Sequence, residues 1–158
     1  MTDLSHLGPA GDARMVDVTA KEVSERSARA HGVIRMKPET LAAIQRGNMP
    51  KGDVFSVARV AGIMAAKRTA ELIPLCHPLP LTDVQLSFVA VPDLPGLRAE
   101  AVVRTVSRTG VEMEAITAVA VALVTIFDMG KSIDRTMQIN DIRLVEKSGG
   151  KSGTWKAG

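Results

Sequence analysis

The sequence predicts an α+β fold in which an antiparallel sheet carries helices on one face. Three observations predict it. The expected order of elements is strand, helix, helix, strand, strand, helix, strand; a hairpin pattern lies in the middle of the chain; and one long helical run follows the hairpin in the sequence. This order is typical of the ferredoxin-like arrangement. At 158 residues the chain suits a single domain.

The two ends of the chain lack hydrophobic periodicity. Residues 1–15 are rich in Gly, Ala and Asp, and we expect a flexible N-terminal arm there. Residues 148–158 are rich in Gly and Lys, and we expect a flexible C-terminal tail. The single catalytic α+β domain is therefore predicted to span residues 16–147.

The first half of this domain predicts a strand and two helices. "HGVIRMK" (31–37) favours a short strand, and Pro38 then suits the first turn of the helix "ETLAAIQR", which Gly47 can end. Asp53 is a good N-cap for a longer helix from Val54 to about Leu72. Apolar residues recur in that helix at helical spacing, namely Val57, Val60, Ala61, Met64 and Ala65.

The second half predicts a hairpin, a long helix and a last strand. "VQLSFVAV" and "LRAEAVVRTVSR" flank the turn segment "PDLPG", and "IRLVEK" is the last strand. The run from Glu112 to Ser132 is rich in β-branched residues, but it exceeds the usual length of a strand, so we expect a helix. This helix is apolar nearly all round, whereas packing on a sheet needs only one apolar face. A second subunit is the economical cover for its other side.

Composition restricts the classes of function. Aromatic residues make up only 3% of the chain, which disfavours binding of single-stranded nucleic acid, and the net charge of +3 favours a small polyanion instead. No signal-peptide pattern opens the sequence, and the apolar stretch 115–127 is too short to cross a bilayer, so we expect a cytoplasmic protein without a membrane partner. His6, His31 and His77 share no ligand spacing and there is one cysteine. We therefore expect no metal and no cofactor.

The segment "IPLCHPLPL" (73–81) places a histidine on backbone that three prolines stiffen. His77 is either a hydrogen-bonded core histidine or an imidazole presented to a substrate. Adjacent side chains of an extended segment point to opposite faces. We therefore expect Cys76 to be buried and His77 to face the other way, which excludes a cysteine–histidine nucleophile pair.

Charged residues lie at both ends of the long helix. Glu112 and Glu114 stand two apart, where an extended entry would aim both to one side, or where either would simply stabilise the helix N-terminus. Asp128 and Lys131 are neighbours on one helix face, either as a surface ion pair or as a tuned acid and base. Lys51 lies at a helix start that favours anions, although a solvated loop lysine is the alternative.

Seven motifs, taken in order along almost the whole chain, closely resemble molybdenum-cofactor biosynthesis protein C, the MoaC family of cyclic pyranopterin monophosphate synthases. They are "MVDVTAK" (15–21), "KGDVF" (51–55), "AAKRT" (65–69), "LIPLCHPL" (72–79), "TGVEMEA" (109–115), "DMGK" (128–131) and "KSGGKSG" (147–153). Several of them are long enough to be specific.

The resemblance implies a lyase of the phosphorus–oxygen class. Such an enzyme converts 3',8-cyclo-7,8-dihydroguanosine triphosphate, a cyclised GTP derivative, into cyclic pyranopterin monophosphate with loss of pyrophosphate. The resemblance also implies a homohexamer, a trimer of dimers with active sites at the dimer interface. A non-catalytic oligomeric module that binds a nucleotide or RNA is the alternative class of function.

The same resemblance implies the roles of individual residues. Asp128 and Lys131 become the central acid/base pair, and His77, Glu112 and Glu114 become further catalytic residues. The implied substrate contacts are Leu75, Cys76, His77, Met113, Glu114, Lys51, Arg26 and Lys147.

Helix geometry constrains how these residues can cooperate. On one continuous helix Glu114 and Asp128 are 14 residues apart, which places them about 21 Å apart along the axis. Proton transfer needs contact at about 3 Å, so one subunit cannot bring both residues to the same reacting centre. We therefore expect each site to be shared between two subunits.

Overall fold

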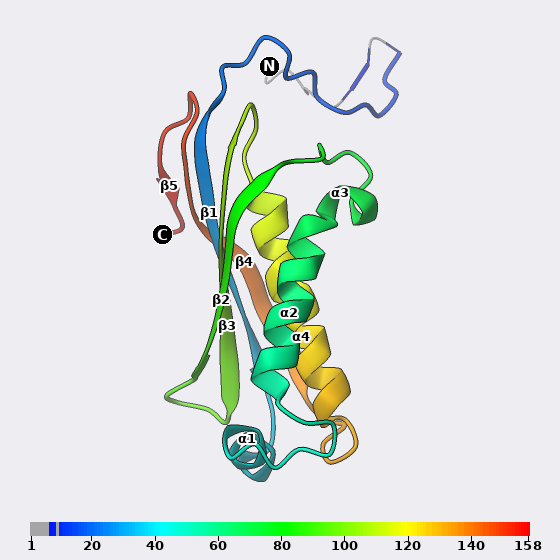
Figure 1. Cartoon of the computed structure of the whole chain (residues 1–158), viewed down its shortest axis with the longest axis vertical. Coiled ribbons are helices and arrows are strands. Elements are labelled where there is room, and N and C mark those ends of the chain that lie inside the picture. The colour runs from blue at the N-terminus through cyan, green and yellow to red at the C-terminus, as the bar shows by residue number, and fades with distance from the viewer. Residues whose placement is uncertain (1–6, 9) are drawn as a thin grey trace.

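The computed structural model describes residues 7, 8 and 10–158, so His6 and part of the predicted arm lie outside the described residues. The elements follow the order β1 (Ser24–Arg35), α1 (Pro38–Gln45), α2 (Val54–Lys67), α3 (Thr69–Leu72), β2 (Leu81–Ala90), β3 (Gly96–Ser107), α4 (Glu112–Gly130), β4 (Gln138–Ser148) and β5 (Trp155–Lys156). The strands form one sheet in the order β2-β3-β1-β4-β5, and every pairing is antiparallel. Helices α2 and α4 lie side by side over one face of this sheet (Figure 1). The predicted α+β fold of ferredoxin-like type is confirmed.

Several element boundaries differ from the sequence prediction. Strand β1 begins at Ser24 instead of residue 31, because its pairing with β3 continues as far as Ser107. The helix expected over residues 54–72 is divided at Arg68 into α2 and α3. At this break the hydroxyl of Thr69 donates to the carbonyls of Ala65 and Ala66, at 3.1 and 3.0 Å, and so competes with the backbone for helical acceptors.

The predicted helix caps are confirmed. The backbone N–H of Ser56 donates to Asp53 Oδ1 at 3.1 Å, which caps α2. Gly47 follows α1 with a φ of +72°, a backbone conformation that glycine adopts without strain. These two residues define the loop between α1 and α2, on which Lys51 lies.

Small residues let both helices approach the sheet closely. A Cβ atom at Gly32 of β1 would lie 2.8 Å from Leu123 Cδ1 of α4. A Cβ atom at Gly62 of α2 would lie 2.8 Å from Leu86 Cδ2 and 2.9 Å from the carbonyl oxygen of Ala118. Larger residues at these glycines would push α2 and α4 outwards, so the two positions determine the spacing of the helical layer.

The outer surface of the helical layer is apolar. Val57, Val60 and Met64 of α2 are 45%, 56% and 47% exposed, although they belong to the apolar series that the sequence shows. The side of α2 that contacts the sheet and α4 consists of small residues, namely Val54, Ala58, Gly62, Ala65 and Ala66. Val124 of α4 is also exposed. Apolar residues therefore lie on two sides of the helical layer, as expected if a second subunit covers the outer one.

A buried aspartate joins the C-terminal end of α4 to the start of α1. Asp134 is 1% exposed, and its Oδ2 accepts hydrogen bonds from Lys37 N and Thr40 Oγ1 at 2.9 and 3.2 Å. Its Oδ1 accepts from the backbone N–H and the hydroxyl of Thr136 at 2.9 and 2.7 Å. Burial opposes ionisation of Asp134, but these hydrogen bonds outweigh it and lower its pKa to about 2.

We predict that Asp134→Ala lowers the free energy of unfolding by about 3 kcal/mol, because hydrogen bonds to a charged group are strong and their buried donors would lose their acceptor. The pKa of Asp134 is lowered from 3.8 to about 2, so its contribution is complete above about pH 5 and is lost as the pH falls through 2. Urea unfolding at several pH values measures the difference between wild type and variant. That difference should be constant above about pH 5 and shrink in stronger acid.

Asp93→Ala is the matched control, because Asp93 is exposed in the turn between β2 and β3. A change below about 0.5 kcal/mol is expected for it. If Asp134→Ala also changes stability by less than this amount, Asp134 does not hold the two elements together.

Candidate active site

A pocket of about 350 Å³ opens beside the N-terminal end of α4. Its wall comes from four segments: the chain before β1, the proline-rich segment before β2, the loop after β3 and the first turn of α4. The lining residues are Val16, Val18, Lys21, Leu75, Cys76, His77, Leu79, Thr109, Gly110, Glu112, Met113 and Glu114. Six residues that the sequence singled out are therefore brought together here, namely Leu75, Cys76, His77, Glu112, Met113 and Glu114.

His77 is a half-buried residue of the pocket wall. Its Nε2 lies 2.7 Å from the carbonyl oxygen of Val16. A carbonyl oxygen can only accept a hydrogen bond, so Nε2 must carry the hydrogen, and in the neutral ring Nδ1 keeps its lone pair. The imidazole is thus held in one orientation with its other nitrogen available as a base.

The burial of Cys76 differs from the sequence prediction. It is half-buried instead of fully buried, and it lines the same pocket as His77. The segment from Ile73 is not simply extended, because Cys76 N donates to Ile73 O in a turn, so the alternation rule does not separate the two side chains. Burial, assisted by the charge of Glu114, raises the pKa of the Cys76 thiol. A protonated thiol is a poor nucleophile, so this environment disfavours a nucleophilic role for Cys76.

The two glutamates of α4 have different environments. The prediction of an extended entry is wrong, because α4 is already helical at Glu112, and residues two apart on a helix point about 200° away from each other. Glu112 Oε1 accepts a hydrogen bond from Lys147 Nζ at 2.8 Å. Glu114 is 4% exposed, and burial, with a smaller contribution from the charge of Glu112, raises its pKa to about 7. Glu114 is thus suited to exchange protons near neutral pH.

Basic residues of β1 and β4 lie near the same end of α4. Lys147 reaches Glu112 from β4, and Arg26 lies on β1 against the loop that follows β4. Gly149 and Gly150 in that loop have φ values of +100° and +70°, and a Cβ atom on either would collide with Arg26. These two glycines therefore allow the loop to lie directly over the guanidinium group.

The second set of predicted residues lies at the opposite end of α4. Asp128 Oδ2 pairs with Lys51 Nζ at 2.8 Å, and Asp128 Oδ1 pairs with Lys131 Nζ at 2.7 Å. The hydrogen bonds from Lys131 and Lys51, in that order, lower the pKa of Asp128 to about 2. All three side chains are about half exposed, so the cluster is open to an incoming anion.

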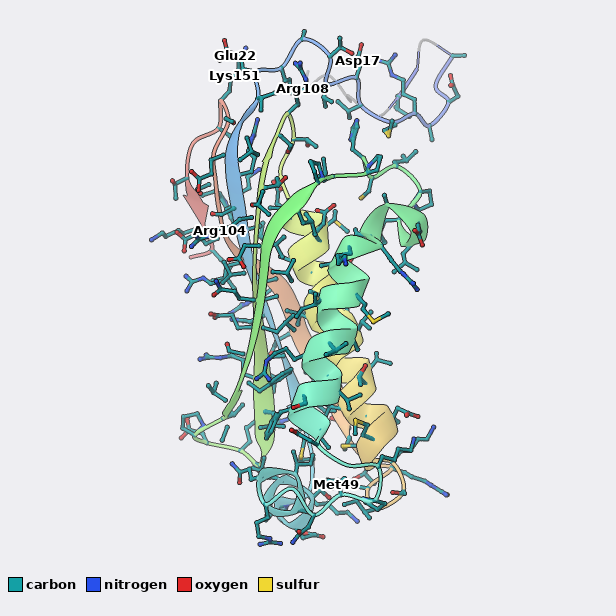
Figure 2. The ribbon with its side chains drawn as sticks, in the orientation of Figure 1. Asp17, Glu22, Met49, Arg104, Arg108 and Lys151 are labelled. Carbon is teal, nitrogen blue, oxygen red and sulfur yellow. The ribbon has the colours of Figure 1, made fainter. Side chains whose placement is uncertain are left out.

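Packing of methionines holds the Lys51 loop at this end. A Cβ atom at Gly130 would lie 2.9 Å from Met137 Cε and 4.0 Å from Met49 Cε, so both methionines cover the last turn of α4. Figure 2 shows Met49 at this end of the molecule, far from Asp17 and Arg108 at the other end. The loop that carries Lys51 is thereby fixed beside Asp128.

The predicted site residues thus fall into two groups. The first is the pocket group, which comprises His77, Glu112, Glu114, Arg26, Lys147 and the contacts Leu75, Cys76 and Met113. The second is the lysine group of Lys51, Asp128 and Lys131. Helix α4 is continuous from Glu112 to Gly130, so Glu114 and Asp128 are about 21 Å apart along its axis.

Sequence reasoning missed the contribution of the segment before β1. Val16, Val18 and Lys21 line the pocket, yet no periodicity marks them and they precede the first regular element. The motif "MVDVTAK" (15–21) was the available signal, although it gave no role to any single residue.

A pocket with an oriented imidazole and a buried carboxyl group whose pKa is near neutral, together with several cations, is suited to proton transfer on an anionic small molecule. The fold and site therefore define a ferredoxin-like α+β protein with the features of an acid/base enzyme. The sequence model of the MoaC family matches residues 15–150. The chain belongs to the MoaC family.

Individual relatives are similar over nearly their whole length. The chain is 59% identical to the cyclic pyranopterin monophosphate synthase of Dinoroseobacter shibae over 157 residues, which is 99% of both chains. It is 59% identical to that of Brucella ovis over 152 residues, 96% of this chain and 92% of the relative. It is 58% identical to that of Thermomicrobium roseum over 156 residues, 99% of this chain and 94% of the relative.

We predict that Glu114→Gln stabilises the protein increasingly as the pH rises from 5 to 8. Burial raises the pKa of Glu114 from 4.5 to about 7, so this group's contribution to stability is complete below about pH 4.5 and is lost as the pH rises through 7. Glutamine has no charge to desolvate, so the gain at pH 8 should be on the order of 2 kcal/mol. Chemical denaturation at each pH measures it.

Glu39→Gln serves as control, because Glu39 is exposed in the first turn of α1. If Glu114→Gln gains the same stability at pH 5 and at pH 8, burial does not raise the pKa of this carboxyl group.

Proposed function

We propose that this protein is a cyclic pyranopterin monophosphate synthase, a lyase of molybdenum-cofactor biosynthesis. It converts 3',8-cyclo-7,8-dihydroguanosine triphosphate into cyclic pyranopterin monophosphate and pyrophosphate. The observation that carries the proposal is the match of the MoaC family to residues 15–150, which includes every residue of the pocket and lysine groups. Relatives that carry this name are 58–59% identical over almost their full length.

The pocket group supplies the acid/base chemistry. Rearrangement of the cyclised guanosine ring system into a pterin requires several proton transfers. Glu114 has a pKa of about 7, so both its protonated and its ionised forms are present at neutral pH. The Nδ1 atom of His77 is a second base in the same pocket, whose wall also contains the apolar side chains of Leu75 and Met113.

The lysine group supplies charge for the release of pyrophosphate. Formation of the cyclic monophosphate expels a leaving group with several negative charges, and fixed cations stabilise that charge as it develops. The ammonium groups of Lys51 and Lys131 both form ion pairs with the carboxylate of Asp128. Asp128 is ionised at neutral pH, so its carboxylate orients both lysines.

A complete site takes the pocket group from one subunit and the lysine group from another. This assignment is supported by the length of α4, which keeps the two groups apart within one chain, and by the apolar outer surface of α2 and α4. A two-fold axis would bring the start of one α4 near the end of the other and would cover that surface. Three such dimers form the proposed homohexamer of this cytoplasmic enzyme.

We predict that the purified protein releases pyrophosphate and forms cyclic pyranopterin monophosphate from the cyclised GTP derivative. Asp128→Ala and Lys131→Ala should each lower kcat by at least about 100-fold, because an acid/base or charge-stabilising group is removed from the transition state. Both side chains are about half exposed, so circular dichroism and size-exclusion profiles should match wild type. Product is measured by chromatography and pyrophosphate by a coupled assay.

Lys67→Ala is the matched control, since Lys67 is an exposed lysine at the end of α2 outside both groups. Its activity should stay within about twofold of wild type. Binding of the nucleotide by wild type and by Asp128→Ala, without product from either protein, would instead favour a non-catalytic binding module.

We also predict that Glu114→Ala and Asp128→Ala proteins, each inactive alone, regain activity when they are unfolded together and reassembled. Random mixing makes about half of the dimers heterodimers, and each heterodimer has one intact shared site of two, so recovery should approach about a quarter of wild type. Native mass spectrometry verifies the mixing. Mixed assemblies that stay inactive would show that both residues serve the site of the same subunit.

A further inference from the structure

The segment before β1 forms one wall of the pocket. Residues 16–21 adopt neither helix nor strand. Val16 and Val18 are half-buried and line the pocket, whereas the alternate residues Asp17 and Thr19 are exposed. This alternation directs apolar side chains towards the pocket and polar ones towards solvent. We call residues Val16–Lys21 the strap.

Among the residues that the structure describes, three hydrogen bonds attach the strap to the rest of the domain. At its start, the carbonyl oxygen of Val16 accepts from His77 Nε2 at 2.7 Å. At its end, Nη1 of Arg108 donates to the carbonyl oxygen of Thr19 at 2.8 Å and also to that of Lys21. The two N–H groups of one guanidinium nitrogen therefore serve two carbonyls of the strap.

Arg108 lies where the chain leaves the sheet. It follows Ser107, the last residue of β3, which pairs with Ser24, the first residue of β1. Its own carbonyl oxygen accepts a hydrogen bond from Arg26 Nη2 at 3.3 Å, so its backbone is attached to the sheet. Figure 2 shows Arg108 and Asp17, a residue of the strap, at the same end of the molecule. By binding the carbonyls of Thr19 and Lys21, Arg108 holds the end of the strap that leads towards β1.

We propose that the strap positions His77 for the reaction and that Arg108 is the positioning residue that anchors the strap. The Val16 carbonyl selects the neutral tautomer with hydrogen on Nε2, so the lone pair stays on Nδ1. When the strap detaches, the ring loses this acceptor, and both tautomers and more than one ring orientation become accessible. The part played in catalysis rests on the proposed function, whereas the effect on the ring does not.

The first test is the tautomer of His77, read from the ¹⁵N chemical shifts of histidine-labelled full-length protein above pH 8. The His77→Gln variant identifies the His77 signals among those of the three histidines of the chain. Wild type should show a protonated Nε2 and an unprotonated Nδ1. Arg108→Ala should show averaged shifts or two sets of signals. A wild-type ring protonated on Nδ1, or an Arg108→Ala ring identical to wild type, would overturn the proposal.

The second test separates positioning from substrate binding. A misplaced catalytic group lowers kcat, so Arg108→Ala should lower kcat by about 10- to 100-fold while KM for the cyclised GTP derivative stays within about threefold. Arg104→Ala is the matched control, because Arg104 is another exposed arginine of the β3 segment, four residues earlier (Figure 2). It should leave kcat, KM and the His77 signals unchanged.

The two tests distinguish the possible failures. A raised KM with unchanged kcat in Arg108→Ala would make Arg108 a substrate contact and would overturn the positioning role. Equal losses of kcat in Arg104→Ala and Arg108→Ala would mean that the effect arises from the loss of positive charge in general. This result would also overturn the positioning role of Arg108. If wild type makes no product but its His77 tautomer responds to Arg108→Ala, the proposed function fails and the anchoring of His77 by the strap stands.

Discussion

The continuous helix α4 is the constraint on which the rest of the structure depends. It packs against the sheet and α2 along its length, and no proline or internal glycine interrupts it between Glu112 and Gly130. A helix of this length is rigid, so the charged groups at its two ends keep a constant separation of about 21 Å. The glycines at positions 32 and 62 let β1 and α2 approach it closely, which makes the spacing of the whole domain depend on this one element.

The two ends of α4 place carboxyl groups in opposite electrostatic environments. Glu114 is buried at one end and its pKa is raised to about 7. Asp128 is exposed at the other end between two lysines, and its pKa is lowered to about 2. The first is suited to proton exchange near neutral pH and the second to the orientation of cations. Under the proposed function, the groups for ring rearrangement and those for pyrophosphate release therefore lie at different ends of one helix.

The same separation makes an isolated chain an incomplete enzyme under the proposed function. Neither group alone provides both acid/base catalysis and neutralisation of a triphosphate. The exposed apolar residues of α2 and α4, such as Val60 and Val124, lie on the surface that a second copy would cover. Burial of this surface would supply the free energy of association, and the shared site would be its functional consequence.

The sequence by itself determined the fold class, the order of the longer helices and strands and the identity of the polar residues, because these depend on local patterns. It did not predict the short elements α3 and β5. Asp53 as an N-cap, Gly47 as a stop and the length of α4 are all local features, and the structure agrees with each. Resemblance to the family supplied the expected roles of residues such as Asp128 and His77, which spacing alone left open between structural and functional alternatives.

Only the tertiary structure decided how these residues are grouped and tuned. The apolar series of α2 could not reveal which side faces the sheet, because the helix is apolar on more than one side. The raised pKa of Glu114 depends on burial by segments distant in the sequence, and the orientation of His77 depends on a carbonyl 61 residues earlier. Such long-range contacts leave no periodic signal in the sequence, so the strap and its anchor Arg108 became visible only when the chain was folded.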